Sequence, residues 1–272
     1  MIPQYYIPSK LPGIVDVIHE QKSFDSGKWK FLPDGKIELM FRIGSGSGMQ
    51  ITNSRITDKN ESPGEGFCFL AGFCTKPVQI SFERMHFISI QMTPLALKSL
   101  FGIPAYELRD FAIAGDLLDL NLNEIEDKIN KLPDFMSRAK WLEAHLVSKV
   151  KESPALNVAL GILNLTKKLS QNNFTYPVKK VDAFLGYSKT QSNRIFNEWL
   201  GLSTLKYQRM MQFTQSIHHI HSSEASESLT DLGLRLGYYD QAHFIRSFKE
   251  FAEITPGKYK KIMTQIPGQL IL

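Results

Sequence analysis

The carboxyl-terminal part of this chain carries one pattern twice, and an internal repeat constrains a fold more than any other feature of a sequence. The first copy is VKKVDAFLGYSKTQSNRIFNEWLGLSTLKY (178–207) and the second is LTDLGLRLGYYDQAHFIRSFKEFAEITPGKY (229–259). With one extra residue in the second copy, a Leu-Gly-Tyr turn, an arginine, a phenylalanine, a glutamate and a final Lys-Tyr fall in register. Each copy therefore predicts a helix-turn-helix unit, whose expected ligand is double-stranded DNA.

Local signals place the helices of each unit. The glycine of each turn permits the positive φ with which the chain reverses between two helices, and the tyrosine after it is expected to pack under the pair. Ser188 and Asp240 are the expected N-caps of the second helices, which we predict at 188–200 and 240–252. The apolar residues of these helices are expected to face the core, and they are Ile195, Phe196, Trp199, Phe244, Phe248 and Phe251.

The opposite face of each second helix carries side chains that suit the edges of DNA bases. Arginine pairs with guanine, amides pair with adenine, and methyl groups contact the thymine methyl. In a helix-turn-helix the amino-terminal part of the second helix enters the major groove. The expected DNA-binding residues are therefore Lys189, Thr190, Asn193 and Arg194 in the first unit and Gln241, Ala242, Ile245 and Arg246 in the second.

The segment between the units sets their distance. Residues 203–221 are expected to form one helix, about 28 Å long at 1.5 Å per residue. Major grooves on one face of B-DNA recur every ~34 Å, so one chain can place its readers in two successive grooves if the DNA bends. A helical solenoid or a protein-interaction bundle is the alternative, and the arginines shared in register by both copies disfavour it.

The excess positive charge lies in the same half of the chain. Residues 1–151 contain 18 Lys+Arg and 18 Asp+Glu, whereas residues 152–272 contain 14 and 9. The net charge of +5 therefore belongs to the half with the repeat. Basic charge on that half is what neutralisation of DNA phosphates requires.

The second copy also resembles a known family. Residues 237–260, GYYDQAHFIRSFKEFAEITPGKYK, are similar to the carboxyl-terminal signature of AraC-type (AraC/XylS family) transcription regulators, and the resemblance extends over about 155–263. It implies a seven-helix DNA-binding domain, taken as 155–265, with two helix-turn-helix units joined by a long helix. It also implies promoter DNA and RNA polymerase as partners. The base contacts that it implies are at Thr190, Asn193, Arg194, Gln241, Ala242, Ile245 and Arg246.

Two residues depart from the family pattern. Glu253 stands where the family usually has glycine, so this helix end lacks the residue that most easily adopts the left-handed conformation. Ser192 stands where the family favours leucine. The resemblance implies that first units vary more than second units, so these departures bear on sequence preference and not on DNA binding.

The amino-terminal half reads as strands followed by helices. Strands are expected at 13–19, 29–32, 37–43, 67–73, 78–82 and 86–92, and helices at 95–101 and over 123–151 with a break at Pro133. Pro33-Asp34-Gly35 predicts the turn of a hairpin between two of these strands. The expected class is α+β, in which a β-rich regulatory domain (1–150), a small antiparallel sheet or barrel with helices, precedes the all-α DNA-binding domain. The first half loosely resembles the sensory half of one AraC-type subgroup.

The role of residues 1–150 is open between two alternatives. They sense a small-molecule effector that controls DNA binding, or they form a protein-interaction module, for instance of a homodimer, that takes no ligand. Few polar residues converge in residues 1–92, which favours the second alternative. Asp34, Glu38 and Arg42 alternate along a candidate strand, and we expect them on an exposed face of that strand and not in a pocket. The apolar face of 123–151 packs on its own sheet or on a second subunit.

Other patterns indicate no further chemistry. The chain has no phosphate-binding loop, nucleophile elbow or metal-ligand spacing, so we expect no enzyme, no catalytic residue, no metal and no cofactor. His218, His219 and His221 are expected at a solvated helix end, and Cys68 and Cys74 as free thiols. No signal peptide or apolar span of about 20 residues is recognisable, so the expected location is the cytoplasm, on the nucleoid, without a membrane partner. The tail after Pro267 is expected to be loose.

Overall fold

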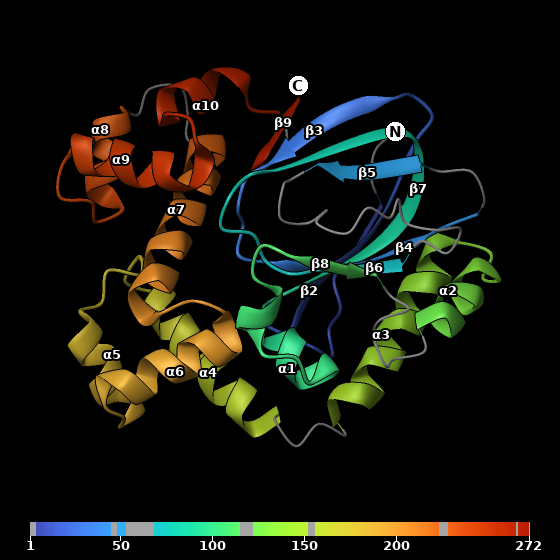
Figure 1. Cartoon of the computed structure of the whole chain (residues 1–272), viewed down its shortest axis with the longest axis horizontal. Helices are drawn as coiled ribbons and strands as arrows, with labels where there is room; N and C mark the ends of the chain where they lie inside the picture. The colour runs from blue at the N-terminus through green and yellow to red at the C-terminus, as the bar shows by residue number, and fades with distance from the viewer. Residues whose placement is uncertain are drawn as a thin grey trace.

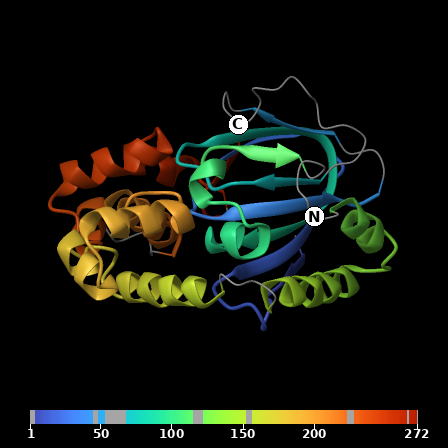
Figure 2. The same ribbon diagram turned by 60° about the horizontal axis from the view of Figure 1, so that its bottom comes forward.

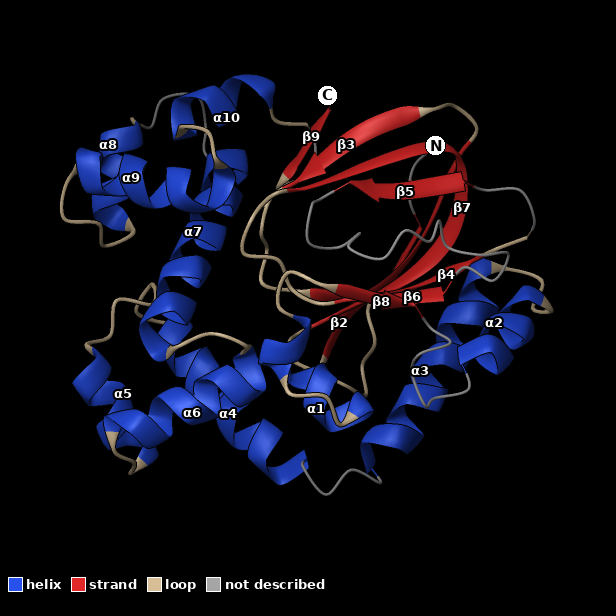
Figure 3. Ribbon diagram, in the orientation of Figure 1, coloured by secondary structure: helices blue, strands red, loops and turns tan. Residues whose placement is uncertain are grey.

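The computed structural model describes residues 4–44, 48–52, 68–114, 122–151, 156–222, 228–264 and 266–271. A curved antiparallel sheet stands beside a group of helices, and further helices cover one side of the sheet (Figure 1). Figure 3 separates the strands of the first half from the helices of the second half. The α+β class predicted from the sequence is confirmed.

Strand β7 (Val78–Met92) organises the sheet, because its two halves pair with different strands. The second half of β7 lies between β2 (Val15–Ser23) and β4 (Ile37–Arg42), and its first half lies between β3 (Gly27–Phe31) and β5 (Gly48–Thr52). The two predicted strands at 78–82 and 86–92 are thus one strand. The sheet is completed by β1 (Gln4–Tyr6) beside β2, and by β6 (Cys68–Ala71) and β8 (Ala112–Ala114) beyond β4.

The hairpin predicted around Pro33-Asp34-Gly35 is wrong. In the described chain β3 pairs with β7 and β9, and β4 pairs with β6 and β7. The turn residues do change the direction of the chain: the Asp34 carboxylate accepts a hydrogen bond from the Lys36 N–H at 2.9 Å, and Gly35 has a φ of +73°. The turn carries the chain from one half of β7 to the other, and pattern alone does not reveal a partner so distant in sequence.

Helix α3 (Phe135–Lys151) shows where the apolar face predicted for residues 123–151 packs. It packs on β1 and β2 of its own sheet, and Figure 2 shows it beneath the sheet beside the amino-terminal strands. The Tyr6 hydroxyl donates to Glu143 at 2.5 Å, and Arg138 donates to both carboxylate oxygens of Glu20. The other elements on this side are α1 (Leu95–Phe101), the 3₁₀ turn η1 (Ala105–Leu108) and α2 (Leu122–Asn130).

The second half of the described chain holds seven helices, as the sequence predicts. Their bounds are α4 (Leu156–Ser170), α5 (Val178–Leu185), α6 (Lys189–Leu200), α7 (Thr204–Ser222), α8 (Leu229–Arg235), α9 (Gln241–Ala252) and α10 (Pro256–Ile262). Helix α7 is the long connecting helix, of 19 residues. Among the described residues, no helix has both the length and the apolar character needed to cross a membrane.

Residues 268–271 of the tail after Pro267 are ordered, contrary to expectation. Strand β9 (Gln269–Ile271) pairs antiparallel with β3, on the edge that faces the helices (Figure 1). The Leu32 N–H donates to the Gly268 carbonyl at 2.8 Å, the Gly268 N–H donates to the Tyr259 hydroxyl at 2.9 Å, and Leu270 is only 2% exposed. The tail is held because it satisfies the backbone groups of an edge strand and buries a leucine.

We predict that Leu270→Asp detaches this strand, because a buried leucine is replaced by a charge. Amide hydrogen exchange measured by mass spectrometry should show faster exchange of peptides covering Phe31 and Leu32, with little change in β2. The matched control is Ile266→Asp, which changes an exposed residue just before this tail. Equal protection of β3 in Leu270→Asp and wild type would contradict the anchoring role of β9.

Candidate DNA-binding surface

The first unit consists of α5 and α6. Gly186 ends α5 with a φ of 69°, and Ser188 caps α6. The Ser188 hydroxyl accepts from the Gln191 N–H at 3.3 Å, and the Gln191 side chain accepts from the Ser188 N–H at 3.1 Å. This reciprocal pair satisfies two amides that the first turn of a helix leaves free. The N-cap predicted at Ser188 is confirmed.

The second unit consists of α8 and α9. The turn contains Gly237, with a φ of 83°, and Asp240 caps α9 by accepting from the His243 N–H at 2.6 Å. Tyr238 is 3% exposed and packs on Phe244, with ring centroids 5.0 Å apart. The N-cap predicted at Asp240 is confirmed.

Both units are built on α7. Near its start, the Tyr207 ring packs on Phe196 of α6 with centroids 5.7 Å apart. Two turns further on, Phe213 packs on Phe248 and Phe251 of α9 at 5.0 and 5.2 Å. The predicted core residues are buried in both helices, except that Ile195 is half-buried. One helix therefore fixes the distance between the two second helices.

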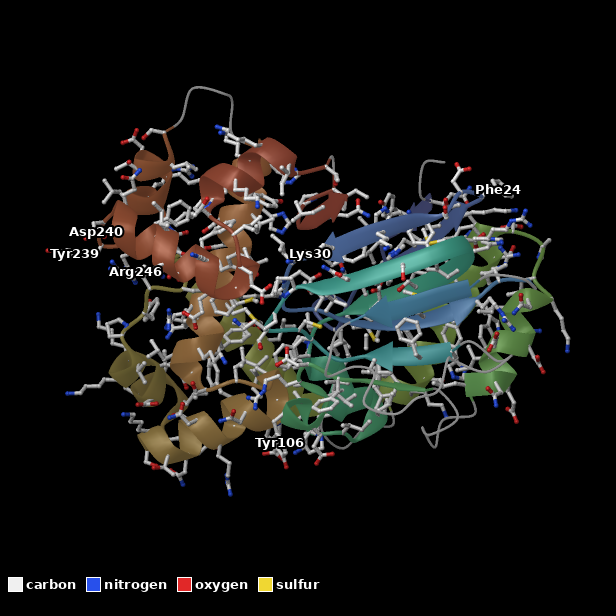
Figure 4. The ribbon with its side chains drawn as sticks, turned by 45° about the horizontal axis from the view of Figure 1, so that its top comes forward. Phe24, Lys30, Tyr106, Tyr239, Asp240 and Arg246 are labelled. Carbon is white, nitrogen blue, oxygen red and sulfur yellow. The ribbon has the colours of Figure 1, made fainter. Side chains whose placement is uncertain are left out.

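The predicted DNA-binding side chains lie on the opposite face of α6 and α9. Six of the eight are exposed, namely Lys189, Thr190, Arg194, Gln241, Ala242 and Arg246, and the remaining two, Asn193 and Ile245, are half-buried. Figure 4 shows Arg246 at the outer edge of the molecule, close to Asp240 and Tyr239 at the start of α9. Each helix therefore presents an exposed polar face beginning at its capped end.

Asn193 has a structural task that the sequence does not reveal. Its side-chain carbonyl accepts the Thr204 N–H at 3.1 Å, which satisfies an amide in the first turn of α7. The contact ties α6 to the start of α7. The amide NH₂ and the second lone pair of the carbonyl oxygen remain available to a ligand.

The end of α6 is docked on the amino-terminal half. The Arg109 guanidinium donates to the Gly201 carbonyl at 3.1 Å, and Lys98 pairs with Glu198 and lies 5.2 Å from the Trp199 ring. Gly201 has a φ of 72°, and a Cβ there would overlap the ring of Phe73. A close approach of this kind requires glycine.

The end of α9 is docked on the other side of the same half. Glu253, which has the left-handed φ of 60° expected where the family has glycine, pairs with Lys30 of β3 at 3.5 Å. The Lys76 ammonium donates to the Glu250 carbonyl at 3.1 Å, where the end of the helix dipole is negative. A glycine at 253 would relieve the backbone but lose the pair with Lys30, which Figure 4 places between sheet and helices.

Comparison with known proteins agrees with this geometry. Residues 183–262 match the family described as a helix-turn-helix domain, and residues 9–114 match a family described as a domain of unknown function. The multiple antibiotic resistance protein MarA of Escherichia coli (strain K12) is 30% identical over 101 residues, which cover 36% of this chain and 76% of MarA. The chain belongs to the AraC-type family of transcription regulators.

Two further comparisons cover more of this AraC-type chain. The helix-turn-helix regulator YtdP of Bacillus subtilis (strain 168), itself uncharacterised, is 24% identical over 197 residues, which cover 69% of this chain and only 23% of YtdP. The chain thus spans under a quarter of that relative. A crystal structure of ToxT from Vibrio cholerae O395 superimposes with a TM-score of 0.44 and 15% identity over 92% of this chain and 97% of ToxT. The family consists of DNA-binding transcription regulators and not of enzymes.

The amino-terminal half of this AraC-type chain contains a polar cluster that sequence reasoning missed. His19 and Met40 both lie opposite Ser89 in the sheet, so these residues share its inner face with Glu38. The Ser89 hydroxyl donates to Glu38 at 2.5 Å, and the His19 ring lies 3.7 Å from the same carboxylate. Residues from three strands meet here, which explains why a reading along the chain did not find them.

The cluster continues toward the turn after β3. Gln91 donates to Asp34 at 3.2 Å, and burial raises the pKa of Asp34 to about 6. Asp34, Glu38 and Arg42 are half-buried, so the expectation of an exposed strand face is wrong. Apolar side chains adjoin this cluster on the same inner face, and they are Trp29, Met40, Phe69, Phe82, Met85 and Phe87.

The remaining predicted features have ordinary contacts. Cys68 and Cys74 are free, and burial raises the pKa of both thiols. The His221 ring lies 2.8 Å from the Tyr259 hydroxyl, and Arg235 lies 3.3 Å from His219. The described residues contain no group of three side chains placed to hold a metal ion.

Ser192 distinguishes the first unit of this AraC-type chain from the second. In the aligned repeat it takes the place of Phe244. It is 0% exposed, and its hydroxyl has no hydrogen-bond partner within the described chain. A buried hydroxyl without a partner destabilises a fold by about 1–3 kcal/mol.

We predict that Ser192→Ala increases the free energy of unfolding by about 1 kcal/mol, because it removes an unpaired buried hydroxyl. Urea denaturation followed by circular dichroism gives the difference. Ser216→Ala is the matched control, since that buried hydroxyl donates to the Gln212 carbonyl at 2.9 Å and its loss should not stabilise the protein. A loss of stability in Ser192→Ala equal to that in Ser216→Ala would show that Ser192 has a partner.

Proposed function

We propose that this regulator reads two successive major grooves of promoter DNA, one with α6 and one with α9. The observation that carries the proposal is the pair of exposed polar faces at the capped ends of these helices, held on a single helix of 19 residues. Residues 155–265 form the DNA-binding domain in this proposal, and residues 1–150 form the regulatory domain. The length of α7, about 28 Å, is shorter than the groove repeat of ~34 Å, so we expect the bound DNA to bend.

The eight side chains take different roles in this proposal. Arg194 and Arg246 each direct a guanidinium fork at a guanine, and Gln241 pairs with an adenine. Thr190, Ala242 and Ile245 supply methyl contacts to thymine, and Lys189 meets a phosphate. Asn193 acts mainly by holding α6 to α7, because its carbonyl is already engaged.

We predict that Arg246→Ala weakens binding to the selected site by about 1–3 kcal/mol and relaxes the preference at one base pair. A site obtained by selection from random DNA, followed by fluorescence anisotropy with the full chain at fixed salt, measures both effects. Arg246→Lys is the matched variant: it keeps the charge but loses the fork, so it should lose base discrimination and keep the salt dependence.

Two results would overturn the proposal. One is the absence of salt-dependent binding of the full-length protein to any selected duplex. The other is wild-type affinity and preference in the double variant Arg194→Ala, Arg246→Ala.

For the amino-terminal half we propose control by a small-molecule effector bound at the inner face of the sheet. The support is the cluster of Glu38, Ser89 and His19 next to a buried cluster of aromatic and methionine side chains, which suits a ligand with one polar end. Self-association through residues 1–150 without a ligand stays the alternative, although the apolar face of α3 is already covered by its own sheet. RNA polymerase is the proposed partner at the promoter.

We predict that one compound class among sugars, aromatic acids and fatty acids raises the melting temperature of the full chain. A ligand at a hundred times its Kd stabilises the native state by about 2.7 kcal/mol. Glu38→Ala should abolish the shift, whereas Glu107→Ala, on the exposed surface of η1, should keep it. A shift that survives Glu38→Ala would move the site elsewhere, and no shift with any class would favour the ligand-free alternative.

A further inference from the structure

Two tyrosines stand in the turns of the helix-turn-helix units with their rings in solvent. Tyr239 is 87% exposed and Tyr187 is 47% exposed. Tyr6, Tyr238 and Tyr259 all have hydrogen-bond partners for their hydroxyl groups, whereas neither exposed hydroxyl makes such a bond within the described chain. An aromatic ring with a free polar tip, exposed to this extent, suits a contact with a partner.

The two residues are equivalent by position. Each directly precedes the N-cap of a second helix, which is Ser188 in the first unit and Asp240 in the second. The alignment of the Leu-Gly-Tyr turns instead pairs Tyr187 with Tyr238, and it predicts that both rings pack beneath the helices. That prediction holds for Tyr238 and is wrong for Tyr187, although the N–H of each donates to the carbonyl five residues earlier.

The backbone holds both side chains in defined places. The Tyr187 N–H donates to the Asp182 carbonyl at 3.2 Å, and the Tyr239 N–H donates to the His243 ring at 3.3 Å. Figure 4 shows Tyr239 projecting outward beside Asp240, on the same edge of the molecule as Arg246. A tyrosine has only two side-chain torsions, so such a residue loses little conformational entropy on binding.

We propose that Tyr187 and Tyr239 each donate a hydrogen bond to a DNA phosphate at the edge of the groove that the following helix enters. The proposal rests on the DNA-reading function proposed above. A helix that inserts its amino-terminal end into a groove brings the preceding turn up to the phosphates that border the groove, and tyrosine hydroxyls are among the usual phosphate donors.

The repetition of the feature favours DNA over a protein partner. DNA presents the same phosphate edge again one helical turn further along, so one residue type in equivalent places meets equivalent groups. A protein surface has no reason to repeat itself at that spacing. Contacts of this kind set the register of each helix in its groove and carry no sequence information.

The test measures the affinity of full-length Tyr187→Phe, Tyr239→Phe and the double variant for the selected duplex and for a scrambled one. Each single change should weaken binding to both duplexes about 10- to 150-fold, as expected for one hydrogen bond to a charged group. The salt slope should stay unchanged, because no charge is removed. Tyr106→Phe is the matched control, since this tyrosine is 49% exposed on η1, which packs at the carboxyl-terminal end of α6 near Gly201, at the opposite end from the capped start.

A neutral methylphosphonate introduced at one phosphate at a time identifies the partner. Replacement of one phosphate should lower the DNA affinity of wild type but not lower further that of Tyr239→Phe. Replacement of a second phosphate should have the same selective effect for Tyr187→Phe. A merely structural role of the hydroxyl would not produce this pairing.

The outcomes separate this inference from the proposed function. Phenylalanine variants that bind like wild type, while Arg246→Ala is impaired, would overturn the inference and leave the function standing. A loss confined to the selected duplex would also overturn it, because it would indicate a base contact. If wild type itself shows no salt-dependent binding, the proposed function fails.

Discussion

The arrangement of both readers depends on the packing of aromatic side chains along one helix. Tyr207 near the start of α7 closes on α6, and Phe213 near its middle closes on α9. Because the α-helix is stiff over this length, the two contacts fix the separation and the relative rotation of the exposed faces. The two units share a support, so neither has a complete hydrophobic core without α7.

The amino-terminal half adds a second set of constraints at the opposite ends of the same helices. Arg109 and Lys98 meet the end of α6, and Lys30 and Lys76 meet the end of α9. The capped starts of both helices stay clear of these contacts. Trp29 is next to Lys30 in β3 and packs on the apolar side chains of the inner face of the sheet. A change in the packing of those side chains can therefore shift Lys30 and, through its pair with Glu253, the end of α9.

What the sequence predicted well is local, and what it missed depends on distant partners. The N-caps at Ser188 and Asp240, the long helix and the core positions follow from residue type and from a period of 3.6. The hairpin failed because β3 and β4 find their partner in β7, about 50 residues along the chain. The cluster at Glu38 and the cap that Asn193 provides were missed for the same reason, since their partners come from other elements.

Strand β9 has a consequence for the behaviour of the protein in concentrated solution. It meets β3 through backbone hydrogen bonds and buries the side chain of Leu270, so β9 of a second molecule can form the same contacts at this edge. Reciprocal exchange of this segment produces a swapped dimer that needs no new interface. In such a dimer the amino-terminal sheet of one copy would pair with the β9 that follows α10 of the other copy. Detachment of β9 from its own β3 would then be the step that permits dimerisation.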